Sequence, residues 1–245
     1  MSITSSITTQ AQAPRAAGIL VGSIIATLLL WYVIPYGRTI AYPLVLLSTL
    51  VHEMGHGIAA IIVGASFEQF VMYSDGSGVA MWRGHVGAFG RAFISAGGLV
   101  GPAFCAGLGF YFGRTERGSR ATLMIFGLGL IVSILMVVRN PFGILFVGLA
   151  AALSIFVSTK GQPWASQVLL LFLASQLALS VFSRGDYLFT DVAHTSQGPM
   201  PSDVAKISEA LFLPYWFWGA VCGLISVAIL FIGLRASLGF RSGGR

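Results

Sequence analysis

Long apolar stretches follow one another along this chain, with only short polar segments between them. A helix crosses the hydrocarbon core of a bilayer with about 20 mostly apolar residues, and several of these stretches reach or approach that length. Candidate spans occupy residues 18–34, 39–64, 88–112, 121–138, 142–157, 164–182 and 211–234. The fifth is short for a full crossing, so we expect a tilted, kinked or partly re-entrant helix there. The pattern predicts an all-α polytopic membrane protein with six or seven transmembrane helices.

The segment between the second and third spans has a different pattern. Several apolar and aromatic residues at positions 67–73 are followed by Asp75-Gly76-Ser77-Gly78 and then by a second apolar run at 79–82. An Asp-Gly pair between two such runs is typical of a tight hairpin turn. We therefore expect a short β-hairpin after the second span.

Two pairs of glycines stand four residues apart in the third span and directly after it, at Gly97 and Gly101 and at Gly109 and Gly113. Small residues at this spacing allow membrane helices to approach closely. We interpret these glycines as helix-packing positions and not as substrate contacts.

Composition agrees with a protein embedded in a bilayer, because 56% of the 245 residues are hydrophobic and 9% are charged. Soluble domains carry about a quarter charged residues. The net charge of +6 does not indicate a nucleic-acid partner, since the basic residues stand singly at the ends of apolar runs. We expect contact with the lipid bilayer, and a multi-pass protein of a bacterial inner membrane or an organelle membrane. The sequence leaves orientation and oligomeric state open.

The predicted organisation is a polar leader at residues 1–17, one transmembrane domain at residues 18–235 and a polar tail at residues 236–245. The first apolar run has no basic region before it and no convincing small-residue cleavage site after it. We therefore expect a retained span and not a signal peptide.

The second span contains the motif His52-Glu53-Met54-Gly55-His56, which has the pattern H-E-x-x-H. Helical spacing of four residues places both imidazoles on one face, one turn apart, where they can bind one ion. A catalytic zinc site has three protein ligands and a fourth position for water. We predict that His52 and His56 bind Zn²⁺ and that Glu53 is the general base. Without a metal, these polar groups would be costly inside an apolar span.

A carboxylate is the expected third ligand. Asp203 is the first choice, because Pro201-Ser202-Asp203 can start a helix, although an ordinary capping role for Ser202 or Asp203 explains the same pattern. Further candidates are Asp186 and Asp191, followed by Asn140, His85 and His194. The residues alone leave the third ligand open.

The chain resembles the site-2 protease superfamily of intramembrane zinc metallopeptidases, in particular its compact membrane-only branch. The likeness is carried by residues 51–57 with the H-E-x-x-H motif, residues 75–78 of the expected hairpin, residues 96–102, and residues 202–205 ahead of Pro214 and Trp216. The resemblance implies a metallopeptidase-like domain at residues 18–235, zinc on His52 and His56, Glu53 as base, and a membrane protein as substrate.

The resemblance also implies that the hairpin pairs with extended substrate, so we assign Gly78 and Asn140 to substrate binding. This pairing has a physical reason. A transmembrane helix hides its carbonyls in internal hydrogen bonds, and a strand edge can satisfy the backbone groups that unwinding exposes.

The chain departs from the main family pattern in one respect. It lacks a later Leu-Asp-Gly segment whose aspartate is the third zinc ligand there, and residues 139–143 occupy the corresponding place. We predict a zinc-dependent intramembrane endopeptidase, with a catalytically inactive pseudoprotease that binds or chaperones membrane partners as the alternative. A metal transporter or another membrane hydrolase is a third reading, but transport needs polar residues along one pathway, and most spans contain almost none.

Overall fold

The computed structural model describes residues 3–183, 188–195 and 198–238. Helices dominate, and two short hairpins are present. In chain order the elements are α1 (Ile3–Tyr32), α2 (Gly37–Ile40), α3 (Tyr42–Ile62), β1 (Ser66–Met72), β2 (Gly78–Arg83), α4 (Ala88–Gly113), α5 (Glu116–Met136), α6 (Pro141–Thr159), α7 (Pro163–Ser183), β3 (Val192–Thr195), β4 (Gly198–Pro201), α9 (Asp203–Leu211) and α10 (Tyr215–Ser237).

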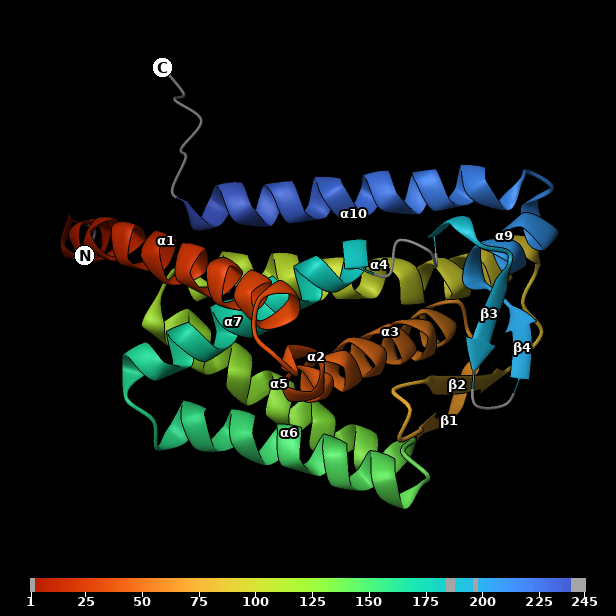
Figure 1. Ribbon diagram of the computed structural model, residues 1–245, viewed down its shortest axis with the longest axis horizontal. Coiled ribbons are helices and arrows are strands. Elements are labelled where there is room, and N and C mark those ends of the chain that lie inside the picture. The colour runs from red at the N-terminus through yellow and green to blue at the C-terminus, as the bar shows by residue number, and fades with distance from the viewer. Residues whose placement is uncertain (1–2, 184–187, 196–197, 239–245) are drawn as a thin grey trace.

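Seven of the described helices, α1, α3, α4, α5, α6, α7 and α10, are long and apolar enough to cross a membrane. They run roughly along the long axis of the molecule, while both hairpins and α9 lie towards one end (Figure 1). Helix α4 is central and packs against α3, α7, α9 and α10. This arrangement confirms the predicted all-α membrane fold with a hairpin after the second span.

Two predicted span boundaries are wrong. The fifth span is not short, because α6 begins at Pro141 and continues for 19 residues. Proline at the first position of a helix starts it instead of interrupting it. The seventh predicted span, 211–234, begins four residues too early: Leu211 is the last residue of α9, Phe212 ends that helix with a left-handed φ of 66°, and α10 begins at Tyr215 after Pro214. Apolar content alone does not reveal such a break.

Helix α1 begins at Ile3, so the predicted leader at residues 1–17 is helical where the structure describes it. The part of α1 that is apolar enough for a span begins at Arg15. Most of the predicted tail at residues 236–245 lies outside the described residues. The domain boundaries therefore remain a prediction.

Glycines set the distance between α4 and its neighbours. A Cβ atom on Gly55 of α3 would lie 2.3 Å from the carbonyl oxygen of Gly97 in α4. A Cβ atom on Gly109 would lie 2.7 Å from the Cβ atom of Ala174 in α7. Both distances are shorter than real contacts, so the backbones approach as closely as they do because side chains are absent. The helix-packing interpretation of Gly97 and Gly109 agrees with these contacts.

The first hairpin is fixed to the rest of the protein along β1. Strands β1 and β2 are antiparallel, with Phe70 opposite Ala80 and Met72 opposite Gly78. On its other side, Phe70 donates its N–H to the carbonyl of Val137 at 2.7 Å and accepts the N–H of Arg139 at 3.1 Å. Strand β1 therefore lies between β2 and residues 137–139, and the outer edge of the hairpin belongs to β2.

Asn140 extends this attachment by one more pair of bonds. Its side-chain amide donates to the carbonyl of Met72 at 2.6 Å, and its Oδ1 accepts the Met72 N–H at 3.1 Å. The structure thus places Asn140 as a brace behind β1. Its predicted role in substrate binding stays a prediction.

The second hairpin was not predicted from the sequence. Strands β3 and β4 have four residues each and pair antiparallel. Two of the four residues of β4 are prolines, Pro199 and Pro201, which weaken the sequence signal of a strand. This hairpin precedes α9 and faces the same cavity as β2.

Replacing Gly233 of α10 with alanine is expected to destabilise the protein by about 1–3 kcal/mol through overpacking. A Cβ atom there would lie 2.7 Å from the Cα atom of Gly107 in α4. The measurement is thermal unfolding of the detergent-purified protein followed by circular dichroism. The matched control is Gly129→Ala, because nothing lies within 4 Å of a Cβ atom at that position. Equal unfolding midpoints for the two variants would contradict the close contact between α4 and α10.

Candidate metal centre

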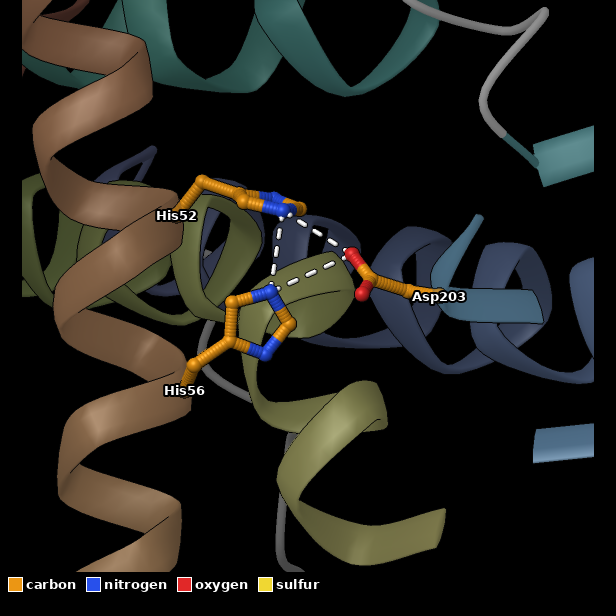
Figure 2. A group of neighbouring side chains, drawn as sticks. All are labelled: His52, His56 and Asp203. Atoms are coloured by element: carbon orange, nitrogen blue, oxygen red, sulfur yellow. Dashed lines mark hydrogen bonds and ion pairs between the residues drawn. The ribbon is translucent and has the colours of Figure 1, made fainter. Parts of the chain in front are cut away.

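Two histidines of α3 and an aspartate of α9 converge on one point (Figure 2). Nε2 of His52 lies 3.0 Å from Oδ2 of Asp203, and Nε2 of His56 lies 3.2 Å from the same oxygen. The two Nε2 atoms are 3.1 Å apart. Within the described residues, His52, His56 and Asp203 form a cluster of potential ligands that could hold a metal ion.

The ring of His56 is oriented by the neighbouring helix α4. Its Nδ1 lies 2.8 Å from the carbonyl oxygen of Ile94, and since a carbonyl only accepts, Nδ1 carries the proton and donates. In the neutral ring Nε2 is then unprotonated and faces His52 and Asp203. Gly98 leaves the space for the ring, because a Cβ atom there would lie 2.2 Å from Nε2 of His56.

Asp203 is placed by the start of α9. Ser202 is the N-cap residue, and its Oγ accepts the N–H of Ala205 at 3.1 Å and donates to the carbonyl of Thr190 at 2.6 Å. The N–H of Ser202 donates to the carbonyl of Asp191 at 2.9 Å. The expected capping role of Ser202 is confirmed. Asp203 in the first turn of α9 reaches the histidines, and its role as the third metal ligand stays a prediction.

The two oxygens of Asp203 have different partners. Oδ2 faces the histidines, while Oδ1 accepts from Nζ of Lys206, one turn further along α9, at 3.2 Å. Burial alone would raise the pKa of the Asp203 carboxyl, but the His56 and His52 side chains lower it well below its ordinary value. The carboxylate is therefore ionised and presents one oxygen to the histidines.

These three side chains fit a zinc ion. An unprotonated Nε2 of His56 and a carboxylate oxygen are both acceptors, so they attract each other at 3.2 Å only when a proton or a cation lies between them. Zinc ligands lie about 2.0–2.2 Å from the ion, which makes the edges of a tetrahedral site about 3.3–3.6 Å long. The observed edges of 3.0, 3.1 and 3.2 Å are close to that size.

Glu53 points from α3 towards β2. The residue is 9% exposed, and its Oε2 accepts the backbone N–H of Ala80 at 2.7 Å. Gly78 permits this approach, because a Cβ atom there would lie 3.0 Å from Cγ of Glu53 and 2.8 Å from Cγ2 of Thr49. The absence of a side chain at position 78 therefore lets β2 lie against the motif helix.

A cavity of about 430 Å³ contains the candidate metal ligands and Glu53. It is bounded by α3, by the outer edge of β2, by the start of α4, by β4 and by one face of α9. The face of α9 contributes Asp203, Lys206 and Glu209, and α4 contributes Arg91. The cavity is large enough for several residues of a peptide and places them beside the ligands.

Those of the other third-ligand candidates whose side chains the structure describes do not join the two histidines. Asp191 and His85 are exposed, and Asn140 is bonded to β1. Asp186 lies outside the described residues, as does the side chain of His194. The sequence interpretation missed three contacts of the site. They are the contact of Lys206 with Asp203, that of the Ala80 N–H with Glu53, and that of Gly98 with the ring of His56. The spacing of three residues between Asp203 and Lys206 was the one available signal for them.

The family profile described as Peptidase M50B-like matches residues 20–233 of the chain. Comparisons with curated proteins and with solved structures gave no match. The matched region includes the H-E-x-x-H helix, both hairpins and Asp203. The chain therefore belongs to the Peptidase M50B-like family, which is part of the site-2 protease family of intramembrane metallopeptidases.

Proposed function

We propose that this protein is a zinc-dependent intramembrane endopeptidase that cleaves a membrane-embedded segment of another protein. The observation that supports this most is the convergence of Asp203 Oδ2 on Nε2 of both His52 and His56. These residues supply two nitrogens and one carboxylate oxygen, which is a donor set found in catalytic zinc sites. Family membership supports the same activity at the level of a metallopeptidase.

In this proposal His52, His56 and Asp203 would hold the metal. Zinc in such a site polarises the scissile carbonyl and lowers the pKa of water. Glu53 takes the proton of the attacking water and later delivers it to the leaving amine. The Ile94 carbonyl keeps His56 in the tautomer that binds through Nε2, and Lys206 leaves Asp203 one oxygen for binding.

The substrate binds in an extended form along β2. A transmembrane helix must unwind before its carbonyls can be attacked, and the freed backbone groups then need new partners. The outer edge of β2 lines the same cavity as the ligands and can supply those partners. Gly78 allows β2 to lie close to α3 because it has no side chain, whereas Asn140 holds β1 in place on the side away from the substrate.

The pseudoprotease alternative was motivated by the missing Leu-Asp-Gly segment. Asp203 belongs to a different part of the chain, yet its Oδ2 lies 3.0 Å and 3.2 Å from Nε2 of His52 and His56, which supports it as the third ligand. Glu53 is also retained and lines the cavity. These two observations favour the protease over an inactive partner-binding protein.

Zinc analysis of the detergent-purified protein tests the metal site. Wild type is expected to contain one zinc per chain, and His56→Ala and Asp203→Ala are each expected to lose it, because either change removes a ligand. Asp191→Ala is the matched control, since this exposed acid near α9 does not join the cluster. Retention of zinc by Asp203→Ala would show that another group is the third ligand.

Glu53→Gln is expected to lower the rate of cleavage by about 10²–10⁴-fold while zinc content stays unchanged. Glutamine keeps the size of the side chain but cannot accept the proton. The measurement is cleavage of a reconstituted single-span protein whose span contains helix-breaking glycine and proline, assayed with zinc content of the same preparation. Equal cleavage by wild type and variant would remove Glu53 from the mechanism, and no cleavage by zinc-loaded wild type would favour the pseudoprotease.

A further inference from the structure

The hydrogen-bond pattern of the first hairpin determines which backbone groups face the cavity. In an antiparallel pair, residues alternate between those that bond to the opposite strand and those whose N–H and C=O point away from it. Both groups of Phe70 bond to residues 137–139, so the pair formed by Phe70 and Ala80 is of the second kind. The N–H and C=O of Ala80 therefore point outward from β2.

The same reasoning applies two residues away. Both backbone groups of Met72 bond to the Asn140 side chain, and Met72 is opposite Gly78. Gly78 therefore also directs its N–H and C=O away from β1. Because Gly78 and Ala80 line the cavity, this stretch of the edge is the place where an extended peptide can add as a further strand.

A peptide that adds there needs the Ala80 N–H, and that donor already has a partner. Oε2 of Glu53 accepts it at 2.7 Å. A carboxylate oxygen and a peptide carbonyl are both acceptors, and each needs the N–H to point at it for a strong bond. The two acceptors therefore compete for one donor.

Resting on the function proposed above, we infer that Glu53 occupies the substrate-pairing edge of β2 in the empty enzyme and that an extended substrate displaces it from the Ala80 N–H. The substrate carbonyl takes the donor, and the Glu53 carboxylate is released towards the attacking water. The base is thereby freed by the same backbone pairing that positions the peptide. Glu53 therefore blocks the pairing edge of β2 before substrate binds and acts as the base afterwards.

The identity of the side chain at position 53 must then affect peptide affinity separately from cleavage. Glu53→Gln and Glu53→Ala both lack the base, so cleavage is strongly slowed in both variants. Glutamine retains an oxygen that can accept the Ala80 N–H, and alanine does not. Loss of one neutral hydrogen bond changes an equilibrium by about two- to tenfold. We expect Glu53→Ala to bind an extended peptide about two- to tenfold more tightly than Glu53→Gln.

The probe is a short fluorescein-labelled peptide of alternating threonine and valine, and binding to the zinc-loaded, detergent-purified variants is followed by fluorescence anisotropy. The same peptide with N-methyl groups on alternate residues cannot pair as a strand and is expected to bind weakly to both variants. A matched pair of controls is Glu209→Ala and Glu209→Gln, which change another carboxylate of the cavity. These two controls are expected to have equal affinities.

Adding Ala80→Pro to each Glu53 variant removes the contested donor. The N–H of Ala80 points away from β1, so proline there costs no bond within the hairpin. In this background the two Glu53 variants are expected to bind the probe equally, and zinc content reports that the fold is kept.

Equal affinities of Glu53→Ala and Glu53→Gln would overturn the inference, as would a difference that persists with Ala80→Pro or a probe that binds to neither variant. These results are independent of the proposed activity, which is tested by zinc-dependent cleavage with wild type. Cleavage by wild type together with equal affinities would support the protease function and contradict the inference that Glu53 blocks the edge of β2.

Discussion

The close approach of α3 and α4 is the constraint on which the candidate site depends. Two imidazoles within a membrane-spanning helix need polar partners, because the apolar side chains beside them in the span offer none. Gly55 and Gly98 let the two backbones meet, and this brings the Ile94 carbonyl to His56 and leaves room for its ring. A larger residue at either position would separate the helices or fill the place of the imidazole. The packing of apolar helices and the orientation of a candidate metal ligand are therefore one structural feature.

The third side chain comes from a part of the chain that does not cross the membrane. An aspartate in the middle of an apolar span would be costly, since it lacks compensating groups until the bundle has formed. Asp203 instead stands at the start of the short helix α9, where Ser202 and the backbone of residues 190–191 hold it. Its position near an exposed lysine shows that the carboxylate lies at a boundary between the apolar bundle and a polar cavity.

The sequence was sufficient for the features that depend on local pattern. Apolar length predicted the spans, an Asp-Gly turn predicted the first hairpin, and helical spacing predicted that His52 and His56 share a face. It was not sufficient for contacts between distant segments: His52 and Asp203 are 151 positions apart, and the choice among acids depended on how α9 folds back. The contact of Glu53 with Ala80 involves a backbone N–H, which every residue except proline has, so the residue type at position 80 does not predict it. The second hairpin was missed because its strands are short and rich in proline.

The arrangement of the first hairpin follows from the cost of unpaired backbone groups near a membrane. One edge of β1 is covered by residues 137–139 and by Asn140, so a single edge, that of β2, faces the cavity. An unpaired N–H on this edge and an unpaired carboxylate on α3 would each be costly away from water. The bond between Ala80 and Glu53 offsets both costs at once. An extended peptide would be a suitable replacement because it would offer a carbonyl to the N–H. The attacking water would offer a hydrogen to the carboxylate, so neither group would be left unsatisfied when the partners change.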